Sequence, residues 1–365
     1  MSKKKLAGII IGCIVVVIVV IVYVRLSTAC YLRPLTVDFA DPNLEAAVRE
    51  AIGKPEGLIY PSDLEDLFTL DASARNIIDL SGLENFIDLP ELVLDDNNIS
   101  DITALGHLTN LELLNLNGNQ VDDISALSNL TNLSYLYLAD NEISDITSLS
   151  NLVNLGKHTF FSIPPSEDLD LSHNQISDLS PLSNLTSLEW MVLDDNNIND
   201  ITPLANLTNL TKLSLSDNQI RDISPLASLT NLVMLHLANN QIDDITPLSN
   251  LVGLGTKEWE MISYSLHLDL ASNQITDITP LLNLTALKRL SLSDNQISDI
   301  SPLENLTNLE ELYLYQNQMS DITPLRDNVG LGEGDEVDLQ DNPLSAESVN
   351  TLIPQLEARR VEVLW

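Results

Sequence analysis

The sequence predicts a curved α/β solenoid with a parallel β-sheet on its concave side and short 3-10 turns on its convex side. Three observations predict this fold class. An asparagine returns every 22 residues over most of the chain, two leucines precede it in alternation with other residues, and a Ser-Pro or Thr-Pro step often follows. A unit of this length cannot bury its leucines alone, so successive units must stack to make a core.

The repeat is defined by its asparagines. They stand at Asn97, Asn119, Asn141, Asn174, Asn196, Asn218, Asn240, Asn273, Asn295, Asn317 and Asn342. The steps are 22 residues long, except for two of 33 and a last one of 25. With an atypical first unit around Arg75, about twelve units follow one another. This period and leucine pattern are typical of leucine-rich repeats.

One unit shows what each position is expected to do. Leu312 and Leu314 alternate with outward residues as in a short strand, and their side chains point into the core. The amide of Asn317 turns inward and bonds backbone groups that the turn leaves unpaired. Thr323-Pro324 is expected to start the helical turn, with the threonine hydroxyl as its cap.

Both ends of the solenoid are expected to be covered. Residues 31–66 form a juxtamembrane segment and a helical N-terminal cap, with a helix from Asp41-Pro42 through Ile52 that Gly53 stops. Residues 67–343 form the repeat solenoid. Residues 344–365 form a C-terminal cap, with a helix over 345–360 followed by a strand over 361–363. Terminal units need such polar covers.

Residues 1–30 read as a cytoplasmic stub and a transmembrane signal anchor. Leu6 to Val24 carries no charge and follows three lysines. As a helix it would be about 28 Å long, close to the hydrocarbon thickness of a bilayer. The lysines predict a single-pass protein with its C-terminal body outside the cell. Two alternatives stay open, namely cleavage after Ser27-Thr28-Ala29 and lipidation of Cys30.

Composition excludes some classes of partner and chemistry. The chain has 17 Lys+Arg against 53 Asp+Glu, and four of those cations lie in the first 30 residues, so the body carries 13 − 53, or −40. Nucleic acids and anionic lipid heads would be repelled. The only cysteines are Cys13 and Cys30, so the body has no disulfides. No nucleophile or metal-ligand spacing occurs, which predicts no enzyme and no cofactor.

The string NQISDISPLENLTNL at 295–309 resembles the internalin-type leucine-rich repeats of bacterial surface proteins. The resemblance covers about residues 36–365. It implies a curved solenoid on the cell exterior that binds proteins or peptides, mostly on its concave face. Family members commonly carry a wall-sorting signal or further domains at the C-terminus. This sequence shows neither up to Trp365, which leaves general surface recognition rather than host invasion as the expectation.

The candidate ligand-binding residues are the larger outward side chains of the strands. They are Tyr135, Tyr137, Trp190, Val192, Met234, His236, Tyr313 and Tyr315. Tyrosine and tryptophan are the usual anchors of protein interfaces. The alternative is that aromatic residues favour strands and pack across neighbouring strands.

Two eleven-residue insertions break the period. GKHTFFSIPPS at 156–166 and GTKEWEMISYS at 255–265 start ninety-nine residues apart, at the same place in the coil. They add Phe160, Phe161, Trp259 and Tyr264 to the candidate residues. We expect the insertions to be loops that flank a binding surface on the strands between them. The alternative is that they only cover the edge of the sheet.

Two polar patterns have weaker alternatives. A ladder of aspartates runs through Asp101, Asp123, Asp145, Asp178, Asp200, Asp222, Asp244, Asp277, Asp299 and Asp321. We interpret it as a solvated row, with loose divalent-cation binding as the alternative, since no spacing matches a calcium loop. His236 and His267 near Asp269 suggest a weak metal pair, but surface polar residues are the favoured interpretation.

The sequence therefore predicts a membrane-anchored extracellular protein that binds a protein or peptide ligand through its concave face. The alternative is a structural component of the cell envelope that assembles with copies of itself.

Overall fold

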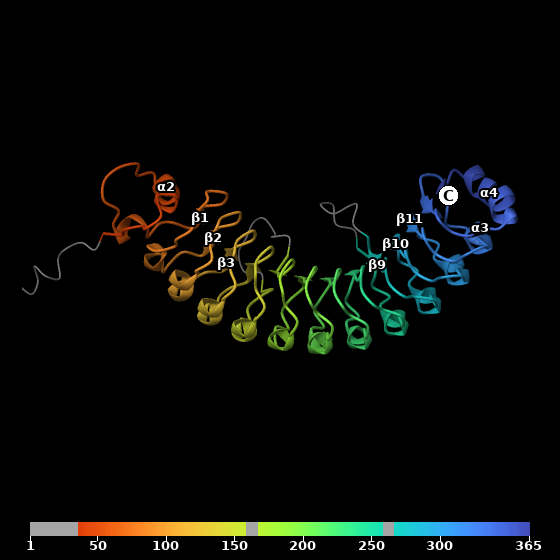
Figure 1. Ribbon diagram of the computed structural model, residues 1–365, viewed down its shortest axis with the longest axis horizontal. Coiled ribbons are helices and arrows are strands. Elements are labelled where there is room, and N and C mark those ends of the chain that lie inside the picture. The colour runs from red at the N-terminus through yellow and green to blue at the C-terminus, as the bar shows by residue number, and fades with distance from the viewer. Residues whose placement is uncertain (1–35, 158–166, 258–265) are drawn as a thin grey trace, which may run out of the picture.

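The protein is described by a computed structural model that covers residues 36–157, 167–257 and 266–365. These residues form an arc, with strands along the inner, concave side and helical turns along the outer side (Figure 1). The predicted solenoid is confirmed. Neighbouring strands stand about 4.8 Å apart, whereas packed helical turns need more room, so the outer side is longer and the stack bends.

Thirteen parallel strands of the described residues form one sheet in chain order. They are β1 Thr69–Asp71, β2 Glu91–Val93, β3 Leu113–Asn115, β4 Tyr135–Tyr137, β5 Leu169–Asp170, β6 Trp190–Val192, β7 Lys212–Ser214, β8 Met234–His236, β9 Leu268–Asp269, β10 Arg289–Ser291, β11 Glu311–Tyr313, β12 Glu336–Asp338 and β13 Glu362–Leu364. Because β5 pairs with β4 and β9 with β8, both insertions leave the register intact.

The convex side is a row of short turns. In chain order they are η2 Leu83–Asn85, η3 Thr103–His107, η4 Ser125–Asn129, η5 Thr147–Asn151, η6 Ser180–Leu182, η7 Thr202–Asn206, η8 Ser224–Ser228, η9 Thr246–Asn250, η10 Thr279–Asn283, η11 Ser301–Asn305 and α3 Thr323–Asp327. All but α3 are 3-10 helices, as predicted. Turns of this kind end after three to five residues because their hydrogen bonds are poorly aligned.

A helix covers each end of the solenoid. At the N-terminal end, α2 Pro42–Ala51 is capped by the Asp41 carboxylate, and the 3-10 turn η1 Pro61–Asp63 follows it. At the C-terminal end, a π-helical turn η12 Ser348–Leu352 runs into α4 Ile353–Ala358. The predicted helix over 345–360 is too long, because Arg360 has a φ of 68° and turns the chain toward β13.

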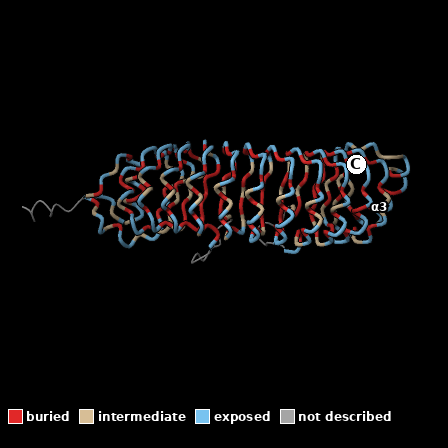
Figure 2. The backbone as a smooth tube through the Cα atoms, turned by 90° about the horizontal axis from the view of Figure 1, so that it is seen from below, coloured by how far each residue is buried: buried red, intermediate tan, exposed pale blue. Residues whose placement is uncertain are grey.

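One continuous hydrophobic core runs from Val37 to Val361. Its leucines and isoleucines have exposed fractions close to zero, and buried segments alternate with exposed ones along every coil (Figure 2). Each fully buried leucine or isoleucine contributes about 1.5–3 kcal/mol to folding. The stacked core therefore supplies stability of the kind that disulfides supply in many small exported proteins.

The asparagine ladder bonds adjacent coils. Asn119 Nδ2 donates to the carbonyls of Leu116 in its own unit and Leu94 in the unit before, both at 3.0 Å, and its Oδ1 accepts the N–H of Ile99 at 3.0 Å. The ladder crosses an insertion without interruption, because Asn174 bonds the Leu138 carbonyl at 2.9 Å. The predicted role of these asparagines is confirmed.

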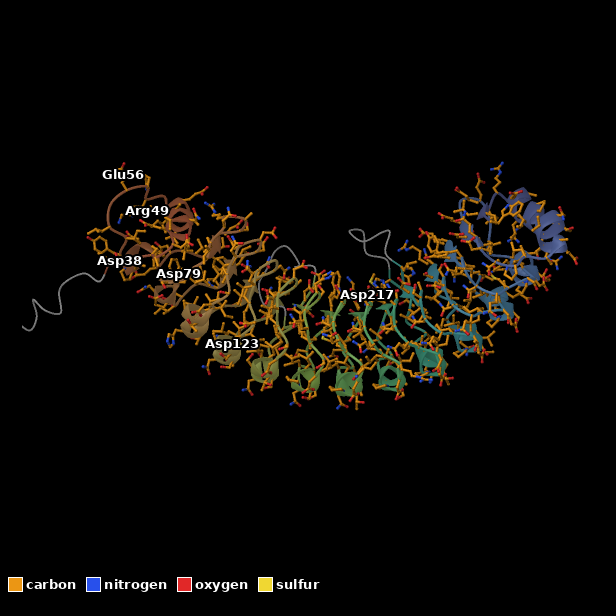
Figure 3. All side chains as sticks on the ribbon, in the orientation of Figure 1. Asp38, Arg49, Glu56, Asp79, Asp123 and Asp217 are labelled. Atoms are coloured by element: carbon orange, nitrogen blue, oxygen red, sulfur yellow. The ribbon has the colours of Figure 1, made fainter. Side chains whose placement is uncertain are left out.

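The aspartate ladder has a local structural role. Each of its ten carboxylates accepts the backbone N–H of the residue two positions on, at 2.8–2.9 Å. Asp123, for example, lies beside the convex turns (Figure 3) and caps η4 through Ser125. The predicted hydroxyl cap is wrong, since Thr323 is already the first residue of α3 and its hydroxyl donates to Asp321 at 2.6 Å. A carboxylate suits this place because it also interacts favourably with the helix dipole.

Within the described residues, no helix is both long enough and apolar enough to cross a membrane. The predicted span over residues 6–24 lies outside them.

Candidate functional site: the concave face

Eight of the twelve candidate ligand-binding residues lie on the concave face, and they differ in exposure. Three of them are buried: Tyr135 at 3%, Tyr137 at 8% and Met234 at 8% exposed. Four are half-buried: Trp190, Val192, His236 and Tyr313. Tyr315 is 38% exposed. The other four, Phe160, Phe161, Trp259 and Tyr264, fall in the parts of the insertions that lie outside the described residues.

Tyr135 and Tyr137 belong to a second, small hydrophobic cluster on the concave side. They pack with Leu113 and with the half-buried Val93 across β2, β3 and β4. These two tyrosines therefore follow the alternative interpretation, in which aromatic residues pack across neighbouring strands. Burial also raises the pKa of Tyr135 to about 12 and shifts the pKa of Tyr137 upward.

The two insertions rejoin the sheet in the same way. The Tyr137 hydroxyl donates to the carbonyl of Glu167 at 2.9 Å, where the first insertion ends. His236 stands ninety-nine residues later, and its Nε2 lies 2.8 Å from the carbonyl of Leu266, where the second insertion ends. Since a carbonyl only accepts, Nε2 must carry the hydrogen. Each ring therefore fixes the end of an insertion to the strand before it.

Glycine is required where each insertion begins. Gly156 and Gly255 both have a φ of 83°, in the left-handed region. A Cβ at Gly156 would lie 2.5 Å from the Ser187 carbonyl oxygen, and one at Gly255 would lie 2.4 Å from that of Ala286. Any side chain would therefore clash with the backbone of the next coil, and the insertions leave the solenoid at one defined place.

Trp190 at the centre of the concave face already holds a cation. The Lys212 ammonium lies 3.5 Å from the centre of the indole ring, and Lys212 is only 4% exposed. Burial lowers the pKa of Lys212 to about 8, while Glu167 and Asp168 oppose this shift. One face of the indole is thus covered by a cation–π contact within the protein.

Two half-buried carboxylates, Asp194 and Asp269, lie near His236. Asp194 accepts the Ser214 hydroxyl at 2.6 Å and the Ser216 N–H at 2.6 Å, and Asp269 accepts the N–H of Ala271 at 3.0 Å. Burial raises the pKa of both carboxyl groups, and His236 opposes that shift. Both carboxylates therefore accept hydrogen bonds from residues of the solenoid itself.

His267 is not the surface polar residue that the sequence suggested, because it is buried beside Arg289. It is 2% exposed, and its Nε2 lies 3.4 Å from an Arg289 nitrogen. Across the described parts of the chain, no group of three or more His, Cys, Asp or Glu side chains is placed to hold a metal ion.

The C-terminal end of the concave face, formed by β11, β12 and β13, differs from the centre. Glu311, Glu336 and Glu362 stand side by side in register, with Tyr313 and Asp338 in the next row. Burial raises the pKa of Glu336, and repulsion by Glu362, Glu311 and Asp338 raises it further. This glutamate row was not predicted from the sequence, although all three residues directly precede the central apolar residue of their strands.

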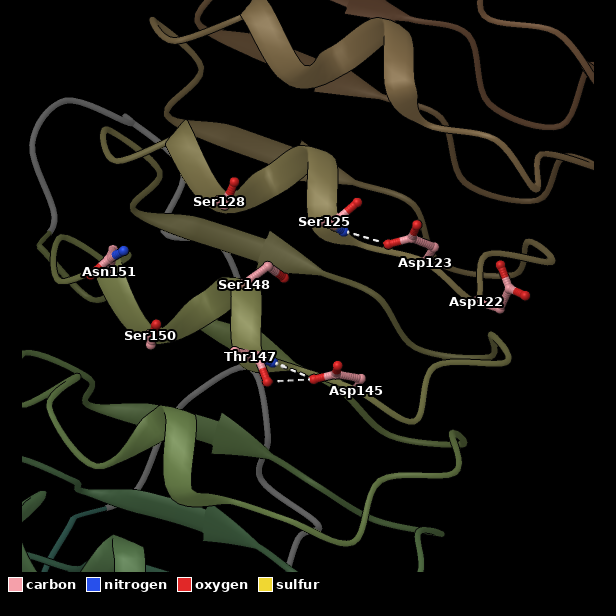
Figure 4. A pocket seen from close by; sticks show the side chains of 9 residues that line it. All are labelled: Asp122, Asp123, Ser125, Ser128, Asp145, Thr147, Ser148, Ser150 and Asn151. Carbon is pink, nitrogen blue, oxygen red and sulfur yellow. Dashed lines mark hydrogen bonds between the residues drawn. The ribbon is translucent and has the colours of Figure 1, made fainter.

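A depression of about 560 Å³ lies on the convex side, between η4 and η5 (Figure 4). Later units fill the equivalent place with a proline such as Pro203, whereas Ala126 and Ser148 are smaller. Its lining residues are Asp122, Asp123, Ser125, Ser128, Asp145, Thr147, Ser148, Ser150 and Asn151. Asp123 and Asp145 are occupied as turn caps, and the lining has no histidine or cysteine to act as a base or nucleophile.

Comparison with protein families shows the repeats. A model described as "Leucine Rich repeats (2 copies)" matches residues 89–129, 109–151, 186–228, 208–250 and 285–327. Two further models, each described as a leucine rich repeat, match residues 145–198 and 266–278. A search of curated proteins found no match.

Several solved structures are similar to the chain. An internalin of Listeria monocytogenes, InlF, is 36% identical with a TM-score of 0.79, over 91% of this chain and 92% of that one. InlJ of the same organism is 23% identical with a TM-score of 0.65, over 83% and 60%. The plant peptide hormone receptor RGFR1, in complex with RGF2, is 21% identical with a TM-score of 0.54, over 82% and 55%. The last two likenesses show a shared fold.

Proposed function

The chain belongs to the internalin-type leucine-rich-repeat proteins, and we propose that it binds a protein or peptide ligand through the concave face of its sheet. The observation that supports this best is the placement of Trp190, Tyr313 and Tyr315. They occupy outward positions in or directly after strands, which the core does not need, and they remain half-buried or exposed. Large aromatic side chains of this kind anchor protein interfaces.

The shape of the face also favours a macromolecular ligand. The concave side is an open sheet of short strands, which offers a wide contact area rather than an enclosed cavity (Figure 1). A peptide hormone receptor of the same fold has been solved in complex with RGF2. Small-molecule sites are usually concave and largely enclosed, which an open sheet is not.

A capture experiment tests this proposal. The body, residues 36–365, would be immobilised and exposed to an extracellular extract, and retained proteins identified by mass spectrometry. We expect Trp190→Ala combined with Tyr315→Ala to abolish retention of the specific partner without changing the melting temperature by more than about 2 °C. Leu282→Ser, at a 38% exposed apolar side chain of η10, is the convex control and should retain it.

The two insertions flank this surface in the proposal. They leave the solenoid at equivalent glycines, four strands apart, with β5 to β8 between them. Deleting residues 156–166 and 255–265 restores a period of 22 and should leave a folded protein. Ligand capture should be lost with them. Undiminished capture by the deletion variant would show that the insertions are not part of the surface.

Tethering belongs to the same proposal. The uncharged segment from Leu6 to Val24 would hold the protein in the membrane, with the acidic body outside the cell. Mass spectrometry of the native N-terminus distinguishes three results: a retained anchor, a chain cleaved after Ala29, and a lipid on Cys30. Only the first supports a transmembrane anchor.

Self-association is the second candidate function. Leu364, the last residue of β13, and Trp365 after it are 38% and 56% exposed, which offers apolar area for a contact between copies. Light scattering over a wide range of protein concentrations tests this. A constant monomer mass would remove the structural-assembly alternative and leave ligand binding.

A further inference from the structure

The C-terminal end of the concave face carries exposed apolar and aromatic side chains beside acidic ones. Tyr315 and Leu364 are each 38% exposed, and Tyr313, two residues before Tyr315, is half-buried. Ser293, two residues after the end of β10, is fully buried, and its hydroxyl has no hydrogen-bond partner among the described residues. The outward side chains that a partner could reach at this end are therefore those of Tyr315 and Leu364.

The negative charge of the neighbouring glutamates indicates the kind of partner that this surface would bind. Glu311, Glu336 and Glu362 stand in adjacent strands, so neighbouring carboxylates are about 4.8 Å apart at the backbone. Within the described residues, none of the three forms an ion pair, and neither does Asp338 in the next row. Like charges in direct register destabilise a sheet, so this row is not explained by folding.

Nearby cations are committed elsewhere. Lys288 pairs with Glu310 at 3.0 Å, and Arg360 pairs with Glu333 at 2.5 Å. Arg289, which faces Glu311 in the register, is 6% exposed and lies against His267. Among the described residues, no basic side chain therefore pairs with the glutamate row.

From this arrangement we infer that the surface of β11 to β13 docks an extended segment of a partner protein that carries two or more arginine or lysine side chains. The inference rests on the proposed function and names the chemistry of its ligand. A guanidinium pairs with carboxylates in a forked geometry and stacks on tyrosine rings, so arginine suits this mixture of groups best.

Spacing indicates how the segment lies. The row offers two places for a cation, each between two neighbouring glutamates. One lies between Glu311 and Glu336 and the other between Glu336 and Glu362, so they are about one strand spacing of 4.8 Å apart. Alternate residues of an extended chain are about 6.8 Å apart, and the flexible stems of arginine bridge the difference. A segment that crosses the strands with basic residues at positions i and i+2 would therefore fill both places.

A second copy of this chain is a poor occupant by the same reasoning. Its acidic residues outnumber its basic ones 53 to 17, so two bodies would repel each other at this face. A partner segment of opposite charge gains affinity and a faster association rate from the same field.

The test uses a fluorescent peptide with an Arg-x-Arg-x-Arg core, added to the body of the protein and followed by fluorescence anisotropy. The triple variant Glu311→Gln/Glu336→Gln/Glu362→Gln should weaken binding about tenfold or more, and Tyr315→Ala severalfold. A matched control, Glu142→Gln/Glu304→Gln/Glu357→Gln, removes the same charge from exposed residues outside the strands. It should keep nearly full affinity.

Three outcomes would overturn the inference. They are a wild-type protein that does not bind the peptide, an equal loss of affinity in the control triple variant, and displacement of the peptide by millimolar calcium at matched ionic strength. The third would assign the row to a metal ion.

The proposed function fails separately, if the Trp190→Ala and Tyr315→Ala variant keeps its captured partner. Circular dichroism would verify that each glutamine variant is folded.

Discussion

The centre and the C-terminal end of the concave face are built from the same repeat and the same register, yet their outward side chains have different environments. In the centre, from β4 to β9, Tyr137 and His236 bond the ends of the insertions, and Lys212 covers Trp190. At the end, from β11 to β13, Tyr315 is exposed and three glutamates lack ion-pair partners among the described residues.

The difference shows what an insertion requires of the strands next to it. A loop that leaves and rejoins a solenoid has backbone groups that the repeat does not satisfy, so neighbouring side chains must bond them. The strands beside the insertions supply these bonds and lose exposed area. Away from the insertions, Tyr315 and Leu364 at the C-terminal end are each 38% exposed, which makes this end of the sheet the more accessible surface.

The largest expected effect comes from the glycine that begins an insertion. Gly255→Ala puts a Cβ 2.4 Å from the Ala286 carbonyl oxygen, in addition to the unfavourable positive φ. We expect it to lower the free energy of unfolding by about 2–4 kcal/mol, measured by urea denaturation. Gly334→Ala, near the C-terminal end, is the control, because its φ is 93° and nothing lies within 4 Å of the added Cβ. It should cost only about 1 kcal/mol, and equal losses would contradict the role of the clash.

A smaller effect is expected from the hydroxyl that fixes the first insertion. Tyr137→Phe removes a buried 2.9 Å bond and leaves the Glu167 carbonyl without that donor, which should cost about 1–2 kcal/mol. Tyr313→Phe removes only a 3.3 Å bond to Glu311 at the surface and should cost less than about 0.5 kcal/mol. Thermal unfolding of the two variants measures the contrast. Equal costs would mean that the hydroxyl of Tyr137 does not help to anchor the insertion.

The smallest effect is electrostatic and depends on pH. The pKa of Glu336 is raised in the folded protein above its ordinary value of 4.5, so the charged form opposes folding at neutral pH. The destabilisation by the charged carboxylate disappears as the pH falls through the pKa that Glu336 has in the folded protein and then below 4.5. Glu336→Gln should therefore be more stable than wild type at pH 7, by less than about 1 kcal/mol because solvent screens the row, and equal to it near pH 4.

Thermal unfolding across this pH range would reveal the trend. The control is Glu304→Gln, an exposed residue of η11, which removes one charge away from the sheet. An identical gain in the control variant would assign the effect to the total charge rather than to the glutamate row.

Much of the fold followed from periodicity, because the same physical demand recurs in every unit. Leu114 and Leu136 must be buried, and Asn119 and Asn141 must bond the turns, so their positions predict strand, turn and register. The aspartate ladder was equally regular, but its role as a cap was missed. A solvated carboxylate and a turn-capping carboxylate leave the same pattern in a sequence.

The candidate site was predicted less completely. An outward strand position is recognisable from alternation, but its exposure depends on what lies next to it in space. Tyr135 and Tyr315 both occupy outward positions, yet Tyr135 is 3% exposed beside the cluster around Leu113 and Tyr315 is 38% exposed. The glutamate row was overlooked because its members are far apart in the chain and only the parallel register brings them together.

The sequence by itself determined the solenoid, the number and order of its units, the places of the two insertions and the caps at both ends. These depend on local spacing, which the amino-acid order records directly. The tertiary structure decided which outward side chains remain accessible, which ones hold the insertions, and where negative charge accumulates without a partner. Those properties depend on distances between coils, and only the stacking of the units sets them.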